Sequence, residues 1–186
     1  MNIQKIDFLK KKFNNKFNSI LLDAPCSALG TFRRNPDVTV KIDQSIIKKH
    51  QKTQLKMLEK SIELLNKQGF LAYVVCSFHP FETIDVIDKI IQKHKNVKIH
   101  SIETDKMIKR QNGYFINPLS FKDIGGSDIF FVSVLEKNIM SVKISPSIIG
   151  GTFSNMEKII SDINKSKAEY IPVSYTHLRA HETAMY

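Results

Sequence analysis

LLDAPCSALG, Leu21–Gly30, is an apolar run that ends on an acid and continues at once into proline, cysteine and serine. A second apolar run, LAYVVCSFHP, Leu71–Pro80, also ends on Cys-Ser with a proline close behind. The two runs therefore place both cysteines of the chain, Cys26 and Cys76, where strands end. Ligands of parallel α/β sheets bind at the carboxyl ends of strands, so we expect the two thiols to face one crevice.

The rest of the chain alternates between strand and helix patterns. Continuous apolar residues predict buried strands over residues 17–24 and 70–77, of the kind that helices cover on both faces. Between them, a helical period runs from Asp43 to about Asn66, with Asp43 or Ser45 as its cap. Gly69 is expected in the left-handed conformation after this helix.

A second helix is predicted over residues 80–95, with its proline in the first turn. Residues 2–9 resemble the end of a short strand, and residues 96–103 and 128–137 alternate like a closing antiparallel pair. A long loop with turn signals is expected over residues 109–128. This order of elements predicts an α/β fold with parallel central strands.

The bulk composition limits the possible functions. The 186 residues allow one domain, or one and a fragment, and carry a formal net charge of +10. Such a basic balance suits RNA or DNA as a partner, although an A/T-rich genome also enriches lysine. No apolar run is long enough to span a membrane. Two widely spaced cysteines predict neither a disulfide framework nor a zinc site, which favours a reduced, cytoplasmic protein without metal.

The paired strand ends point to thiol chemistry. A thiolate can add to an electron-poor carbon, and a second thiol nearby can help a later proton removal. Asp23 is placed to bond an amide-like ring edge, as acids do with the amino group of cytosine. The alternative is that Cys26 and Cys76 simply fill the core. The residues alone support a site without naming its substrate.

Three motifs carry a resemblance to a known family. They are DAPCSALGTFRRNPD (Asp23–Asp37), VVCSFHPFE (Val74–Glu82) and GGSDIFFVSVLEK (Gly125–Lys137). Residues 1–138 resemble RNA cytosine-5 methyltransferases of the RsmB/Nop/Sun family, and the Arg-Arg-x-Pro-Asp sequence resembles the branch that modifies small-subunit ribosomal RNA. The resemblance implies a Rossmann-like class I methyltransferase sheet, S-adenosylmethionine as cofactor, RNA as partner and a monomer.

The resemblance also implies roles for individual residues. Cys76 matches the cysteine that attacks C6 of cytosine, which makes C5 nucleophilic enough to accept a methyl group. Cys26 matches the cysteine that helps release the product by elimination. Asp23 and Pro25 match residues that line the cytosine pocket, and Asp23 is also a candidate for cofactor binding. Asp7 matches an acid near the adenine of the cofactor.

Basic residues are the remaining candidates. Arg33 and Arg34 are implied to meet phosphates or the edge of the site, and Lys109 and Arg110 are further possible RNA contacts. A solvated surface is the alternative for all four. The family also has a Gly-rich cofactor loop, which this chain lacks before Asp7. We therefore expect only the C-terminal half of the sheet, with weak cofactor binding and little catalysis by this chain alone. The alternative function is an inactive, basic RNA-binding fragment.

The sequence changes character after residue 138. Residues 140–173 resemble the start of ribulose-phosphate 3-epimerase, with Ser147 at a substrate-contacting position and Pro172 where a metal-binding histidine is expected. A β-α piece over residues 139–173 cannot close a (β/α)8 barrel, so we expect no epimerase activity. Residues 174–186 resemble translated adapter sequence and are interpreted as a non-native tail. Its His177, His181 and Glu182 are assigned no metal role.

Overall fold

The computed structural model describes residues 5–138, together with residues 158, 161, 162 and 165. The chain divides into two units, Met1–Ile139 and Met140–Tyr186. The four described residues of the second unit are helical. The other residues of the epimerase-like segment, including Ser147 and Pro172, lie outside the described part, as does the whole of the predicted tail.

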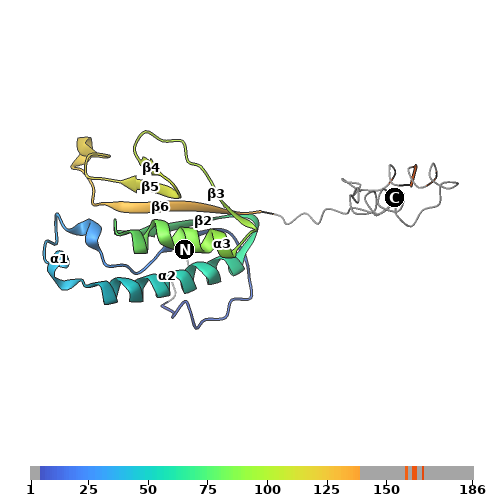
Figure 1. The fold of residues 1–186 in the computed structure, drawn as a ribbon, viewed down its shortest axis with the longest axis horizontal. Helices are drawn as coiled ribbons and strands as arrows, with labels where there is room; N and C mark the ends of the chain where they lie inside the picture. The colour runs from blue at the N-terminus through green and yellow to red at the C-terminus, as the bar shows by residue number, and fades with distance from the viewer. Residues whose placement is uncertain (1–4, 139–157, 159–160, 163–164, 166–186) are drawn as a thin grey trace, which may run out of the picture. The chain divides into compact units, whose positions relative to one another are not determined.

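The first unit is built on one six-stranded sheet (Figure 1). The order is β1-β2-β6-β5-β4, and β3 also pairs with β6. The β1–β2 pair is parallel and the others are antiparallel. The α/β class is thus confirmed, and the strands of the two apolar runs, β1 and β2, form the parallel pair. Only β2 is internal, because β1 ends the strand order. The strands are β1 Phe17–Asp23, β2 Leu65–Val75, β3 Val97–Ile99, β4 Ile108–Arg110, β5 Gly113–Ile116 and β6 Phe130–Lys137.

The helices of this unit are α1 Val38–Lys41, α2 Gln44–Leu64 and α3 Ile84–Lys93, with 3-10 turns at Leu29–Thr31, Pro80–Glu82 and Lys122–Ile124. The predicted cap at Asp43 is confirmed, because its carboxylate accepts hydrogen bonds from the backbone N–H groups of Ser45 and Ile46. Helices α2 and α3 contact each other beside the parallel pair (Figure 1). They bury the apolar side chains that hold β1 and β2 in place.

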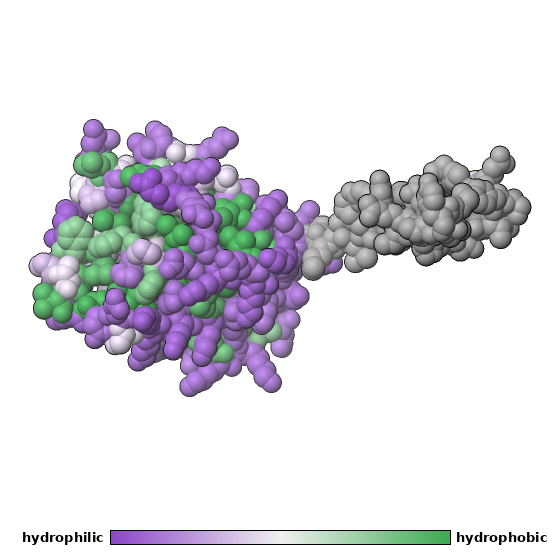
Figure 2. All heavy atoms as spheres, in the orientation of Figure 1, coloured by the Kyte–Doolittle hydropathy of each residue, from purple (hydrophilic) through white to green (hydrophobic). Residues whose placement is uncertain are grey.

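The core explains why these strands form. Each large apolar side chain that is buried completely contributes about 1.5–3 kcal/mol to folding. Strand β2 alternates buried residues along its second half, and β6 does the same. The fully buried apolar residues are Leu58, Leu71, Tyr73, Val75, Val86, Ile87, Ile90, Phe131 and Leu135. Figure 2 shows apolar side chains gathered toward the α1 end of the visible face, and a mostly hydrophilic surface along α2.

The predicted left-handed glycine at the end of α2 is wrong. Gln68 has the positive φ, 61°, whereas Gly69 does not. The helix passes directly into β2, because Leu65 is buried and pairs with Phe17. Gly69 is still required at its position, since a Cβ there would lie 2.9 Å from the carbonyl oxygen of Asn18.

Two further expectations are corrected. Residues 5–10 form no strand, because the Asp7 carboxylate accepts from the backbone N–H groups of Leu9 and Lys10 and closes a turn instead. The expected loop over residues 109–128 contains most of the β4–β5 hairpin, in which Arg110 pairs with Gly113. In the part of the first unit that the structure describes, no helix has the length and apolar character needed to cross a membrane.

Candidate active site

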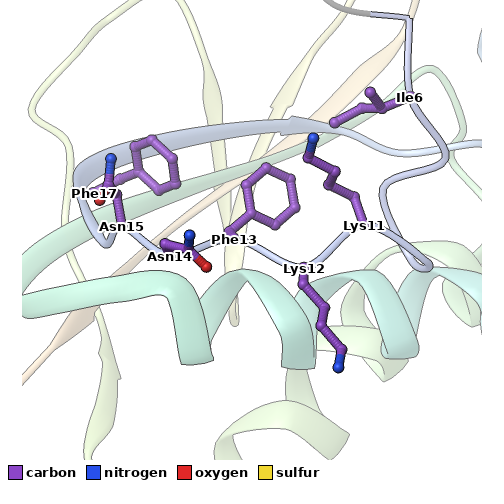
Figure 3. A pocket seen from close by; sticks show the side chains of 7 residues that line it. All are labelled: Ile6, Lys11, Lys12, Phe13, Asn14, Asn15 and Phe17. Atoms are coloured by element: carbon purple, nitrogen blue, oxygen red, sulfur yellow. The ribbon is translucent and has the colours of Figure 1, made fainter.

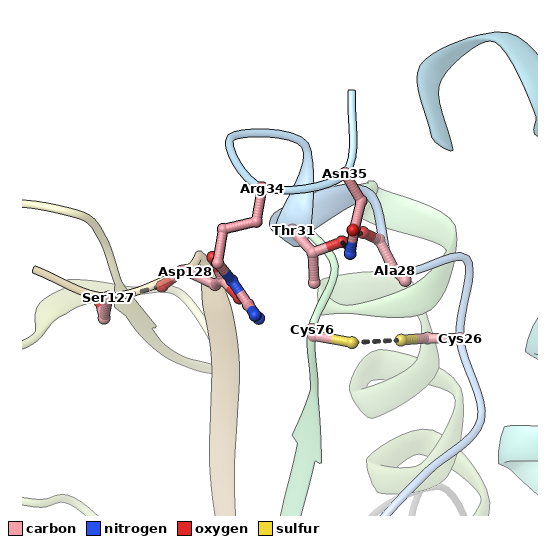
Figure 4. A network of polar contacts seen from close by, with 8 residues as sticks. All are labelled: Cys26, Ala28, Thr31, Arg34, Asn35, Cys76, Ser127 and Asp128. Carbon is pink, nitrogen blue, oxygen red and sulfur yellow. Dashed lines mark hydrogen bonds and ion pairs between the residues drawn. The ribbon is translucent and has the colours of Figure 1, made fainter. Parts of the chain in front are cut away.

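The structure brings the two cysteines together. Cys26 lies in the loop after β1 and Cys76 directly follows β2, so the parallel pairing places both at one edge of the sheet. Their Sγ atoms are 3.3 Å apart and point toward each other (Figure 4). Both thiols are free and only partly buried. They therefore form a contact pair that a small, electron-poor ring can approach.

The two thiols have opposite acidities. The hydrogen bond from Cys26 is the largest influence that lowers the pKa of Cys76, to about 7, and its own backbone N–H acts in the same direction. Burial and the charges of Asp23 and Glu82 oppose this shift. The same thiol pairing, together with burial, raises the pKa of Cys26 far above its ordinary value. The Cys76 thiol therefore ionises more readily than the Cys26 thiol, which keeps its proton.

One buried carboxylate fixes the loops that carry the thiols. Glu82 has no exposed surface, and its Oε1 accepts from the backbone N–H of Ser27 at 2.8 Å. Its Oε2 accepts from the hydroxyls of Ser27 at 2.5 Å and Ser77 at 2.6 Å. Each serine directly follows one of the cysteines, so Glu82 sets the spacing of Cys26 and Cys76. We call Ser27, Ser77 and Glu82 the serine–glutamate clamp.

Gly30 ties the same loop to the middle of the sheet. Its N–H donates to the carbonyl of Cys76 at 3.0 Å, and its carbonyl accepts from the N–H of Ile129 at 3.0 Å. A Cβ at this position would lie 2.0 Å from the carbonyl oxygen of Ile129. Only glycine allows this close approach, and Ala28, with φ of 58°, turns the chain toward it.

Asp23 and Pro25 lie beside the thiols. Asp23 is the last residue of β1 and is exposed, and its charge acts on the pKa of Cys76. The carbonyl of Pro25 accepts from Nε2 of Gln54 at 2.9 Å. Gln54 belongs to α2 and is fully buried, so its hydrogen bond attaches the loop after β1 to that helix. The structure thus gathers Asp23, Pro25, Cys26 and Cys76 at one strand-end site.

The sequence of this chain is similar to those of known RNA methyltransferases. Residues 1–136 match the family 16S rRNA methyltransferase RsmB/F. The chain belongs to this family. The ribosomal RNA small subunit methyltransferase B of Photorhabdus laumondii is 34% identical over 124 residues, which cover 67% of this chain and 27% of that protein. The Drosophila melanogaster tRNA (cytosine(34)-C(5))-methyltransferase is 36% identical over 77 residues, 41% of this chain and 10% of that protein.

A solved structure has the same fold. The crystal structure of NSun6 from Pyrococcus horikoshii with SFG gives a TM-score of 0.60 at 22% identity, covering 73% of this chain and 34% of that one. This likeness confirms the Rossmann-like sheet expected from the sequence. The chain spans about 27% of the length of the RsmB-type relative from Photorhabdus.

The two arginines of the RsmB/F-type motif take different positions. Arg34 reaches across to Asp128, just before β6, and its Nε lies 3.1 and 3.0 Å from the two carboxylate oxygens (Figure 4). This pairing holds the pKa of the buried Asp128 carboxyl below its usual range. Arg33 is exposed, as are Lys109 and Arg110 on β4. The side chain of Arg34 still exposes 63% of its surface.

Sequence reasoning missed several residues of the site. Glu82 and Asp128 stand inside the quoted motifs, but only the folded chain shows that they hold the loops. Phe32 and Phe78 were also missed. Their rings pack edge to face with centroids 6.3 Å apart, and each side chain is about two-fifths exposed. Their signal in the sequence is an aromatic residue in each Cys-Ser loop.

The N-terminal segment forms a separate feature. The predicted cofactor residue Asp7 is exposed and pairs with Lys10 at 3.5 Å, within its own turn. Beside it lies an open hollow of about 600 Å³ lined by Ile6, Lys11, Lys12, Phe13, Asn14, Asn15 and Phe17 (Figure 3). Lys11 and Phe13 lie on one side of the segment there, and Lys12 turns away. None of these residues belongs to the two thiol loops, and the cofactor role of Asp7 stays a prediction.

The described residues offer no obvious metal centre. Within residues 5–138 and the four described residues beyond them, no group of three or more His, Cys, Asp or Glu side chains is arranged to hold a metal ion. His177, His181 and Glu182 lie outside these residues.

Proposed function

We propose that this segment carries the covalent-catalysis half of an S-adenosylmethionine-dependent RNA cytosine-5 methyltransferase that acts on small-subunit ribosomal RNA. The observation that carries the proposal is the thiol pair, 3.3 Å apart at the ends of neighbouring parallel strands, with one pKa lowered and the other raised. Methylation at C5 of cytosine needs a nucleophile that adds and later leaves, and this pair supplies one.

The reaction begins at Cys76. Its thiolate attacks C6 of cytosine, so an S–C6 bond forms while the C5–C6 double bond opens and electron density moves to C5. C5 then takes the methyl group. A water molecule takes the C5 proton, and the electron pair of the C5–H bond restores the C5–C6 double bond and expels the Cys76 thiolate. The Cys26 thiol, which keeps its proton because its pKa is raised, hydrogen-bonds that sulfur and stabilises it as a leaving group.

The neighbouring residues orient the base. Asp23 is exposed at the strand end beside Cys76, where its carboxylate can accept a hydrogen bond from the cytosine amino group. Pro25, held by Gln54, forms the wall of the loop on the same side. The serine–glutamate clamp keeps both sulfurs in place while the ring enters and leaves. Little reorganisation is then needed during the reaction.

The cofactor fits this site only in part. S-adenosylmethionine supplies the electrophilic methyl group when it is bound. Among the described residues, Asp23 is an exposed carboxylate at the correct strand end and is available to a cofactor. Asp7 is less suited, because its carboxylate already accepts from Leu9 and Lys10. We expect most of the cofactor contacts to come from sequence outside the described residues.

RNA is the proposed partner. The net charge of +10 favours a polyanion, and Arg33 lies exposed within the motif that contains Cys26. The exposed rings of Phe32 and Phe78 offer faces on which bases beside the target cytosine can stack. We place the enzyme in the cytoplasm and expect it to act as a monomer. RNA also suits the alternative, an inactive binding fragment.

Two experiments test these functions. The protein, in the longest form that its reading frame encodes (below, the full-length protein), is incubated with S-adenosylmethionine and RNA containing 5-fluorocytosine, which blocks the final elimination. We expect a covalent protein–RNA complex with the wild type and none with Cys76→Ala. An adduct formed by Cys76→Ala would contradict the assignment. Calorimetry of residues 1–138 with S-adenosylmethionine addresses the alternative, since micromolar binding would count against a fragment that only binds RNA.

A further inference from the structure

The thiol pair has a second kind of chemistry available. Two free, partly exposed thiols in contact are the reactants for a disulfide, and their Sγ atoms are 3.3 Å apart. We propose that Cys26 and Cys76 form a reversible oxidation site, at which a peroxide converts the pair into an intramolecular disulfide. Only the consequence for catalysis rests on the proposed function; the site itself rests on geometry.

The residues around the two sulfurs hold them close enough to form a bond after a small movement. A disulfide bond is about 2.05 Å long, so the sulfurs need to approach by about 1.2 Å. The serine–glutamate clamp and the Gly30 bonds hold the loops together from both sides. Cys76 continues directly from a strand in the middle of the sheet, whereas Cys26 lies in an irregular loop. The small movement therefore falls on Cys26.

The reaction balances with hydrogen peroxide as the oxidant. The Cys76 thiolate attacks one peroxide oxygen, so an S–O bond forms, the O–O bond breaks and hydroxide leaves. The Cys26 thiol then gives its proton to the departing oxygen, and its sulfur attacks Cys76. An S–S bond forms, the S–O bond breaks and water leaves. The two sulfurs together lose two electrons, and the peroxide is reduced to water.

The assignment of steps follows from the two environments. Peroxides react with thiolates, and the lowered pKa of Cys76 makes its sulfur the one that attacks the peroxide. Cys26 keeps its proton and acts as the resolving thiol. Oxidation consumes both sulfurs that the proposed methyl transfer needs. A dithiol reductant restores them, so the disulfide is an on–off switch for that reaction.

The chain itself serves for the test. The purified protein is treated with hydrogen peroxide, its remaining thiols are alkylated, and it is digested without reductant. We expect a linked pair of peptides containing Cys26 and Cys76, a loss of two hydrogen masses from the intact chain, and full reversal by dithiothreitol. Sulfinic acid on Cys76 with no linked peptide would overturn the proposal.

Matched variants sharpen the result. Cys26→Ser keeps the size of the side chain but removes the resolving thiol, so Cys76 should pass to sulfenic and sulfinic acid at the same peroxide dose. Glu82→Gln loosens the clamp and should slow disulfide formation several-fold; an unchanged rate would show that the clamp has no part in it. The full-length protein should also lose its 5-fluorocytosine adduct on oxidation and regain it with dithiothreitol. A disulfide in a protein that never forms the adduct would refute the proposed function but leave the oxidation site standing.

Discussion

The two Cys-Ser loops share a dipeptide but differ in their supports. Cys76 continues β2, which lies between β1 and β6, and its carbonyl accepts from Gly30. Cys26 follows β1 at the end of the sheet order, and its loop depends on side chains, among them Gln54 and Glu82. The edge strand β1 is much less buried than β2, and its Leu21 is 73% exposed.

This difference explains how the same Cys-Ser dipeptide supplies a nucleophile at one position and a proton donor at the other. The pKa of Cys76 falls because Cys26 donates to it, and the pKa of Cys26 rises because it is the donor and is more buried. The rigid strand carries the nucleophile, and the loop held by side chains carries its partner. Single substitutions can remove the elements of this asymmetry one at a time.

The largest effect is expected from Cys26→Ala in the full-length protein acting on ordinary cytosine. Without the donor to the leaving sulfur, the Cys76–C6 bond forms but breaks slowly. A covalent protein–RNA complex should accumulate on denaturing gels by about a hundredfold or more over the wild type. Cys76→Ala is the matched control and should show none. Equal, low levels for both variants would contradict the division of roles.

Removal of the clamp is expected to destabilise the fold. Glu82→Ala leaves the two serine hydroxyls and the Ser27 N–H without their buried acceptor, so the free energy of unfolding should fall by about 3 kcal/mol. Urea unfolding of the chain measures this change. Glu82→Gln keeps one acceptor oxygen and should cost about 1 kcal/mol. Equal losses for the two variants would mean that burial, and not the hydrogen bonds, sets the effect.

Thiol reactivity should separate the two cysteines by pH. The Cys76 thiolate fraction rises through its pKa of about 7, so iodoacetamide labelling of Cys76 should be about tenfold faster at pH 8 than at pH 6. Labelling of Cys26 should stay slow throughout, because its pKa is raised. The charges that face Cys76 belong to Asp23 and Glu82, which oppose its ionisation, and Arg34 is the nearby cation.

The control for this profile is Cys26→Ala. Loss of the donor should move the midpoint of Cys76 labelling upward, toward the ordinary thiol value of 9.0. Peptide mapping by mass spectrometry measures both sites. A midpoint that does not move would mean that the Cys76 backbone N–H, and not Cys26, is the main cause of its acidity.

The smallest effect is expected at the exposed end of the loop. Arg34→Ala removes the partner of Asp128, and the unfolding midpoint should fall by less than in Glu82→Ala because the guanidinium is mostly exposed. The pKa of Asp128 is lowered in the folded protein. The stability that the Arg34–Asp128 pair contributes is therefore present above pH 3.8 and is lost as the pH falls through the pKa of Asp128 in the folded protein. Arg33→Ala is the control: its charge acts on Asp128 without a hydrogen bond, so the midpoint should fall less than with Arg34→Ala. A loss that persists in high salt would contradict a screened ion pair.

Much of this site was predictable because strands carry a strong signal. Two continuous apolar runs predicted β1 and most of β2, and their parallel pairing then placed the thiols of Cys26 and Cys76 at one edge. The Asp43 cap was predictable because its hydrogen bonds are local. These features depend on neighbours in sequence or on one topological rule.

The remaining features depend on contacts between distant segments. Glu82 reaches Ser27 across fifty-five residues, and Arg34 reaches Asp128 across ninety-four. The β4–β5 hairpin escaped prediction because Lys109 and Arg110 lack the apolar alternation of a strand, and pairing with β5 forms it instead. At the end of α2, the burial of Leu65 overrides the turn signal of Gly69.

The most direct test of the central claim is to locate the bond in the trapped complex. The full-length protein is trapped on 5-fluorocytosine RNA, digested with protease and nuclease, and the nucleotide-bearing peptide is sequenced by mass spectrometry. The thiol asymmetry predicts a methylated fluorocytosine on the sulfur of Cys76, with Cys26 unmodified in the same sample. A nucleotide on Cys26, or on neither thiol, would contradict it.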